Sequence, residues 1–222
     1  PEMVFVKGGT FQMGSSNGEE DERPVHQVTL SSFHIGKYEV TQAQWREVMG
    51  TNPSYFKKCD QCPVEQVSWY DVQDFITELN TKTGKQYRLP TEAEWEFAAR
   101  GGLKSKGYTY SGSNTVKDVA WMVDNAGSKT HPVGQKQANE LGIYDMTGNV
   151  WEWCADWYGA YSAANANNPK GPSSGGSRVL RGGSWDNLAQ DCRSADRLRY
   201  VAERRNRNCG IRLVLSSGEP GQ

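Results

Sequence analysis

The cysteines carry the strongest potential chemistry in this sequence, and their spacing limits what they could do. Five cysteines occur in 222 residues, so at least one is either a free thiol or bonded to another molecule. Cys59 and Cys62 form a C-x-x-C motif, but no second pair follows at zinc-ribbon spacing and the chain has only three histidines. A four-ligand zinc site is therefore not expected. A local disulfide, a redox pair and two reduced thiols remain open; we favour a structural role, because neither a helix start nor a βαβ pattern follows.

A further cysteine, Cys192, lies in the segment RGGSWDNLAQDCRSADRLRYVAERRNRNCGIRLV, residues 181–214. Gly, Ser, Trp, Ala and aliphatic residues form a skeleton there, and Asp, Asn, Arg, Tyr and Leu are scattered between them. No other cysteine lies between Cys154 and Cys192. The segment therefore raises two alternatives: chemistry at the thiol, or a surface that contacts another molecule.

The composition excludes some classes of partner. A net charge of -1 gives no electrostatic reason to expect nucleic acid or a membrane surface as the main partner. The mean hydropathy is -0.75, and no apolar run approaches the roughly 20 residues that a membrane-spanning helix needs. The opening residues, PEMVFVKGGTFQMGS, predict a strand pair and not a signal peptide, although a leader or anchor could precede them.

Capping signals predict three helices in the first hundred residues. The first follows Thr41. The other two open on capping boxes, Ser68 with Asp71 and Thr91 with Glu94, and a glycine follows each of them. We therefore assign Glu94 to a helix start and not to catalysis.

Strands and loops are predicted for the rest of the chain. Residues 26–40 alternate as paired strands do, whereas helical patterning nearly vanishes over 103–175. Residues 162–177 are typical of an exposed polar loop. Because no internal repeat or linker is visible, we predict one α+β domain with long loops over residues 1–222.

Several phrases of the sequence, in order, resemble the formylglycine-generating enzyme (sulfatase-modifying factor) family. The resemblance implies a C-type-lectin-like fold that is low in regular secondary structure and often binds calcium. The phrases are GGTFQMGS (8–15), YEVTQAQW (38–45), PVEQVSWYDVQDF (63–75), YRLPTEAEWEFAARGG (87–102), LGIYDMTGNVWEW (141–153), RVLRGGSW (178–185) and GIRLV (210–214).

The oxidase branch of that family converts a cysteine of a client sulfatase to formylglycine with oxygen and copper(I). Its chemistry needs two cysteines shortly after the GGS motif, because two thiolates hold Cu(I) linearly and one does not. Here Cys192 matches the second thiol, but Asn187 stands at the position of the first. The resemblance therefore does not favour an enzyme, and copper-dependent oxidation at Cys192 is kept as the alternative.

Another branch that the chain resembles is the variable proteins of diversity-generating retroelements, which display a hypervariable C-terminal surface on the lectin fold. Mutagenesis of template adenines turns Asn codons such as AAC into many residue types, but not into Lys, Glu, Gln, Met or Trp. Residues 186–209 contain no Lys, Met or Trp, one Gln and one Glu. The chain has 12 Lys and 4 Arg up to residue 170, and no Lys and 9 Arg after it. These counts favour a variable binding surface within residues 181–214.

Twelve residues of this region fit the codon rule and are predicted to contact a ligand. They are Asp186, Asn187, Leu188, Asp191, Asp196, Leu198, Arg199, Tyr200, Val201, Arg204, Asn206 and Asn208. The skeleton between them matches the family framework. An alternative remains, because family members without any retroelement carry similar Asn- and Arg-rich tails and could serve as non-catalytic scaffolds.

A metal site is suggested by the family resemblance alone. The phrase GNVWEW matches a calcium-ligating segment of the enzyme branch, so Asn149 and Glu152 are the candidate calcium ligands. The alternative is that Glu152 bonds backbone amides between two buried tryptophans. Trp121 stands near the position where the family's other calcium site would need an Asn.

Together these observations predict a non-catalytic protein that binds a protein or cell-surface ligand, with no nucleic-acid partner. We expect it at the cell surface or outside the cell, with the cytoplasm as the alternative. Binding predicts that the twelve residues point to solvent on one face and that Cys192 is buried or unpaired. Oxidation predicts a second thiol beside Cys192 in an open cleft.

Overall fold

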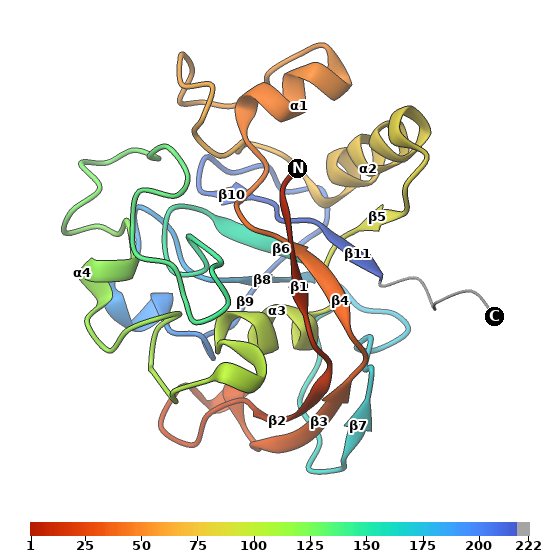
Figure 1. Cartoon of the computed structure of the whole chain (residues 1–222), viewed down its shortest axis with the longest axis vertical. Coiled ribbons are helices and arrows are strands. Elements are labelled where there is room, and N and C mark those ends of the chain that lie inside the picture. The colour runs from red at the N-terminus through yellow and green to blue at the C-terminus, as the bar shows by residue number, and fades with distance from the viewer. Residues whose placement is uncertain (217–222) are drawn as a thin grey trace.

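The computed structural model describes residues 1–216, which form three small β-sheets and several short helices joined by long loops (Figure 1). Residues 217–222 of the predicted domain lie outside the described part. The first sheet has the order β1-β4-β11-β5 and is antiparallel throughout. Its strands are β1 (Met3–Val6), β4 (Phe33–Gly36), β11 (Val214–Ser216) and β5 (Tyr87–Arg88).

The second and third sheets each contain one parallel pair. In the order β10-β6-β8-β9, β10 runs parallel to β6 and the other pairs are antiparallel. In the order β2-β3-β7, β7 runs parallel to β3. The strands are β10 (Cys209–Gly210), β6 (Trp151–Trp157), β8 (Arg178–Arg181), β9 (Leu198–Tyr200), β2 (Gly9–Met13), β3 (His26–Leu30) and β7 (Ala166–Asn167).

The three predicted helices are confirmed. Thr41, Ser68 and Thr91 each accept a hydrogen bond from the backbone N–H three residues later, and each helix start has the full capping box. The α-helices are α1 (Gln42–Met49), α2 (Trp69–Thr83), α3 (Glu92–Ala99) and the single turn α4 (Val116–Val119); the 3-10 helices are η1 (Glu20–Glu22), η2 (Gly102–Lys104) and η3 (Ala189–Cys192). None of the described helices has the length and apolar character that crossing a membrane requires.

Helix α3 lies at the centre of the fold, and all eight of its residues are buried. Its Trp95 and Phe97 pack in one core cluster with residues of β2, β3 and β4. A second cluster joins α1 and α2 to β6 and β8, where Trp45 stacks on Phe75 with ring centroids 4.5 Å apart. Figure 1 shows α1 and α2 at the opposite end of the molecule from the β2-β3-β7 sheet.

Buried ion pairs tie the C-terminal part of the chain to this core. Arg197 bonds both carboxylate oxygens of Glu92 at 2.7 and 2.9 Å, and Arg181 contacts Glu92 and Glu96. Arg212 bonds Glu152 in the same way. Because guanidinium groups match carboxylates in two places at once, these pairs fix both position and orientation.

The polar segment 162–177 differs in part from its prediction as a plain loop. It contains β7, whose Ala166 and Asn167 pair with Val28 and Thr29 of β3. Asn168 extends the contact, since its backbone N–H bonds the carbonyl of Thr29. The paired residues of β3 and β7 are 138 positions apart, and β7 has only two residues. Sequence patterning over such a short strand could not predict this pairing.

Candidate functional site

The twelve residues predicted to contact a ligand lie between β8 and β10, in a stretch that includes η3 and β9. We call the surface formed by residues 186–208 the C-terminal face. Most of the twelve are exposed or half-buried, and Leu188 and Val201 are 56% and 51% exposed. The expectation that all twelve point to solvent is wrong for Asp196 and Asn208, which are only 8% and 7% exposed.

A cavity of about 400 Å³ in the C-terminal face explains these two exceptions, because both residues line it. The cavity brings together seven of the twelve predicted residues with three others. The predicted residues are Asp186, Asn187, Asp191, Asp196, Leu198, Tyr200 and Asn208, and the others are Glu19, Trp151 and Arg197. The remaining five, Leu188, Arg199, Val201, Arg204 and Asn206, do not line the cavity.

The cavity wall is acidic and partly aromatic. Four of its residues carry carboxyl groups, and Arg197, its single arginine, is already bonded to Glu92. The carboxyl of Asp196 has one side-chain ion pair within residues 1–216, to Arg193 at 3.4 Å. Burial raises the pKa of Asp196 to about 8 against the opposing effects of Arg193 and Arg181. A cation that enters the cavity would therefore favour the ionised carboxylate.

Buried and half-buried framework residues hold the backbone beneath this face. Arg193 bonds both oxygens of Glu22 at 2.7 and 2.9 Å, and the indole N–H of Trp185 donates to the carbonyl of Arg207. Gly183 has φ +74°, and a Cβ there would lie 2.5 Å from the Sγ of Cys192. The exposed side chains thus project from a backbone whose path is set by other residues.

Asn187 differs from its exposed neighbours because it is held on several sides. Its Oδ1 accepts from the indole N–H of Trp151 at 2.8 Å and from the hydroxyl of Ser184, and its Nδ2 donates to Asp191. Its carbonyl accepts the backbone N–H of Val123. The residue that occupies the first-thiol position of the oxidase motif therefore joins the C-terminal face to the rest of the fold.

Cys192 is a buried thiol, as the binding hypothesis predicts. It forms no disulfide within the described chain, and Cys154 and Cys209 are likewise free and buried. Burial, with the negative charges of Asp191 and Asp196, raises the pKa of Cys192 to about 12. The thiolate is the form that attacks and that binds soft metals, so this thiol is unreactive near neutral pH. Because Asn187 and not a cysteine stands at the first-thiol position, these residues do not supply the two thiolates that a copper(I) site needs.

We expect the buried thiols to resist alkylation in the native protein. Iodoacetamide at pH 8, without reductant, should leave Cys154, Cys192 and Cys209 unmodified by mass spectrometry, because each is fully buried. The same treatment in guanidinium chloride should modify all three. Alkylation of Cys192 in the folded protein would contradict the account.

The C-x-x-C motif is resolved as a local disulfide between Cys59 and Cys62, with Cα atoms 5.3 Å apart. Of the three alternatives left open by the sequence, the structure contains the local disulfide and not two reduced thiols. Disulfides persist mainly in oxidising compartments.

The candidate calcium ligands are both engaged by protein groups. Glu152 accepts from Arg212 and from the indole N–H of Trp95, at 2.7 Å for the latter. Asn149 accepts from the backbone N–H of His131 and donates to Glu39. Within residues 1–216 no three His, Cys, Asp or Glu side chains gather in a way that could hold a metal ion. Asn149 and Glu152 therefore do not fit a calcium ion without giving up these partners.

Two aromatic residues, far in the sequence from residues 186–208, lie beside the C-terminal face. They were not predicted from the sequence. Tyr55 is 59% exposed and lies 5.5 Å from the guanidinium of Arg207. Phe56 packs edge-on against Trp185, with ring centroids 5.3 Å apart. No motif marks their loop, so only the three-dimensional arrangement reveals them.

Glu65 supports this aromatic loop from below. Its Oε1 accepts the backbone N–H of Phe56 at 2.8 Å, whereas Oε2 is buried and lacks a hydrogen-bond partner in the described chain. Burial raises its pKa from the ordinary 4.5 to about 7. The folded state therefore holds this proton to a higher pH than the unfolded state does.

The shift of Glu65 predicts a pH dependence of stability. Because the folded-state pKa of this acid is raised, the free energy of unfolding should fall as the pH rises from about 4.5 through 7. Asp145, Asp156 and Asp196 are shifted in the same direction. Urea unfolding should give a lower free energy of unfolding for wild type at pH 8 than at pH 5. In Glu65→Gln this decrease should be smaller by about 1–3 kcal/mol. An equal decrease in both proteins would argue against this assignment.

Comparison with known proteins agrees with this geometry. A model of the sulfatase-modifying factor enzyme 1-like domain matches residues 1–217. Chaperone protein LppX of Paenibacillus barcinonensis is 37% identical over 97% of this chain and 89% of its own length. The formylglycine-generating enzyme of Streptomyces coelicolor is 29% identical over 99% of this chain and 92% of its own.

Among solved structures, Treponema denticola variable protein 1 is similar over nearly the whole chain. The TM-score is 0.92 at 34% identity, and the match covers 97% of this chain and 95% of the other. The predicted family resemblance, with its variable-protein branch, and the predicted α+β, C-type-lectin-like fold class are both confirmed. The chain belongs to the sulfatase-modifying factor enzyme 1-like domain family.

Proposed function

We propose that this protein is a non-catalytic binding protein whose C-terminal face contacts a protein or cell-surface ligand. One observation carries the proposal: residues that fit the codon rule either line a cavity or lie on the exposed surface near it, while the backbone beneath them is held by ion-paired arginines. Substitution of exposed side chains usually changes stability by within about 0.5 kcal/mol. Such a surface is therefore free to vary in sequence.

The chemistry of Cys192 supports binding over oxidation. Burial raises the pKa of the Cys192 thiol, and the position of the other thiol holds Asn187, which is bonded to Trp151 and Asp191. The similarity to a variable protein supports a diversified surface, whereas the similarity to formylglycine-generating enzymes reflects the shared scaffold. A role at the cell surface or outside the cell is consistent with the Cys59–Cys62 disulfide.

The charge of the cavity suggests the class of ligand group that enters it. Asp186 accepts from Asn208 through the oxygen that also lies 2.6 Å from the hydroxyl of Ser184, and Asp191 accepts from Asn187 and from the backbone N–H of Leu188 through one oxygen. Each carboxylate retains a second oxygen that a donor could use. We therefore propose that the ligand inserts a lysine or arginine side chain, or another cationic group, beside Tyr200.

A random peptide library displayed on phage tests this proposal directly. Selection on the immobilised protein should enrich peptides that contain Lys or Arg, and their binding should weaken by about tenfold or more in Asp186→Asn/Asp191→Asn. Asp60→Asn, an exposed acidic residue paired with Arg46, is the control and should leave binding unchanged. Enrichment of acidic peptides, or equal binding by both variants, would refute the proposed ligand class.

A further inference from the structure

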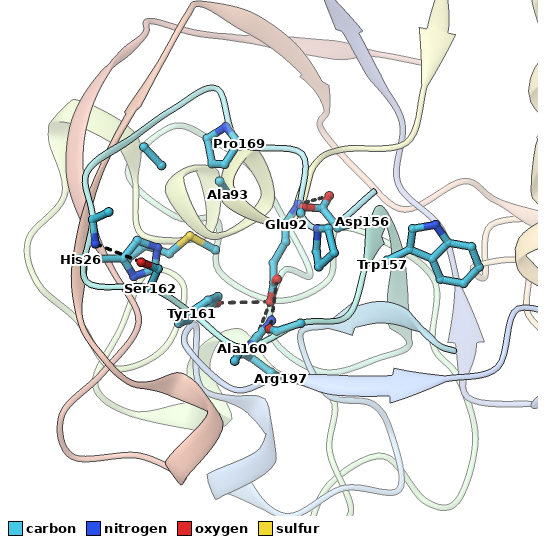
Figure 2. Close-up of a pocket in the computed structure, with 16 residues that line it drawn as sticks. His26, Glu92, Ala93, Asp156, Trp157, Ala160, Tyr161, Ser162, Pro169 and Arg197 are labelled. Carbon is cyan, nitrogen blue, oxygen red and sulfur yellow. Dashed lines mark hydrogen bonds and ion pairs between the residues drawn. The ribbon is translucent and has the colours of Figure 1, made fainter. Parts of the chain in front are cut away.

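A second cavity, of about 230 Å³, lies beneath the segment 159–172 and is lined by none of the twelve predicted residues. It opens between β3, the start of α3 and the end of β6 (Figure 2). The residues with polar or sulfur-containing side chains that line it are Met13, His26, Glu92, Asp156, Trp157, Tyr161, Ser162 and Arg197. Small residues of the covering segment, Gly159, Ala160, Ala164 and Ala166, complete the wall.

The covering segment is held in place, so the cavity exists before any ligand binds. Strand β7 attaches the segment to β3, and Asn168 bonds the backbone N–H of Ser31 at 2.8 Å. Gly159 lies so close to Pro172 that a Cβ there would be 2.5 Å from the proline ring. A preformed cavity avoids the cost of ordering a loop on binding.

Asp156 is the carboxylate in this wall that lacks a direct ion pair within residues 1–216. Arg197 is bonded to Glu92, and the hydroxyl of Tyr161 donates to the same carboxylate at 3.2 Å. Asp156 accepts a hydrogen bond from the backbone N–H of Glu92 through Oδ2. Its Oδ1 faces Gly171, where a Cβ would lie 3.1 Å from this oxygen, so the glycine leaves Oδ1 uncovered by a side chain. Burial, and then the charge of Glu92, raises the pKa of Asp156 to about 7.

His26 supplies a polar group at another part of the wall. Its Nδ1 lies 2.9 Å from the carbonyl of Pro24, which requires the proton on Nδ1 and leaves Nε2 as an acceptor. The residue is only 8% exposed, and its ring packs against Tyr161 with centroids 4.7 Å apart. Figure 2 shows His26 and Asp156 on opposite sides of the drawn cavity, with Tyr161 and Ala93 between them.

We propose that this cavity binds a small primary amine with a short apolar or aromatic body and a hydroxyl group at its far end. The ammonium group bonds Oδ1 of Asp156 and supplies the missing countercharge. The body packs against Met13, Ala93 and Tyr161, and the hydroxyl donates to Nε2 of His26. This site is separate from the cavity of the C-terminal face, although Arg197 lies in the wall of both.

Isothermal titration with three matched compounds tests the proposal. Tyramine should bind with 1:1 stoichiometry, whereas 4-ethylphenol, which lacks the amine, and 3-(4-hydroxyphenyl)propanoate, which replaces it by a carboxylate, should bind about 30-fold more weakly or not at all. Absence of saturable tyramine binding would overturn the proposal. Equal affinities for the three compounds would overturn it as well.

Variants locate the binding and separate it from the proposed function. Asp156→Asn should weaken tyramine binding by about 30-fold, and Ala160→Phe, at the exposed mouth of the cavity, should block it without disturbing the core. His26→Phe should abolish the preference for tyramine over phenethylamine. Asp186→Asn, in the other cavity, should leave tyramine binding unchanged. Unchanged binding in both Asp156→Asn and Ala160→Phe, with folding verified by circular dichroism, would refute the site.

Discussion

Replacing Arg212 by methionine should lower the free energy of unfolding by about 3–5 kcal/mol, because it leaves the buried carboxylate of Glu152 without its countercharge. Arg212 is fully buried, bonds both oxygens of Glu152 and donates to the carbonyls of Gly36 and Tyr144. Chemical unfolding followed by tryptophan fluorescence measures the effect. This arginine holds the end of the chain against two other segments, so its loss should weaken the whole scaffold.

Two controls separate burial from charge. Arg205→Met removes an exposed pair with Asp71 and should change stability by less than about 1 kcal/mol. The double variant Arg212→Met/Glu152→Met should recover part of the loss, because the carboxylate that Arg212 bonds directly is removed as well. A loss below about 1 kcal/mol in Arg212→Met would show that the buried pair does not anchor the scaffold.

Gly183→Ala should destabilise the protein by about 2–4 kcal/mol, because both its backbone conformation and its surroundings exclude a side chain. At φ +74° an alanine is strained, and its Cβ would lie 2.5 Å from the Sγ of Cys192 and 2.9 Å from the carbonyl oxygen of Asp191. The turn that carries Asp191 would have to move. The same unfolding experiment measures the loss.

Gly84→Ala is the matched control for this prediction. Gly84 has φ +68° but lies in open space, so alanine there has the backbone strain without the contact and should cost about 1–2 kcal/mol. The difference between the two variants measures how tightly the framework packs beneath the C-terminal face. Equal losses would mean that Cys192 and its turn can shift freely.

The local elements of this fold could be predicted because their signals lie within a few residues. Thr41, Ser68 and Thr91 each cap a helix where the sequence places them. The lack of a thiol partner for Cys192 was also foreseeable, since Asn187 stands at the position of the first thiol. Short-range chemistry determines each of these features, so neighbouring residues are enough to recognise them.

The features that the sequence did not reveal depend on distant segments. The acidic cavity exists because Glu19 and Trp151 meet residues 186–208, and neither position carries a motif for it. Asp196 and Asn208 fit the codon rule yet are buried, since reachability by mutation says nothing about depth. Likewise β7 joins β3 through backbone hydrogen bonds, which leave little trace in side-chain type.

The central claim is that the C-terminal face varies independently of the scaffold, and the stability of a combined variant tests it most directly. Leu188→Ser, Arg199→Ser, Val201→Asn and Arg204→Ser together replace four exposed residues that do not line the cavity. We predict that urea unfolding of this variant gives a free energy within about 2 kcal/mol of wild type. A loss as large as that expected for Arg212→Met would contradict the account, because it would show that these side chains maintain the fold.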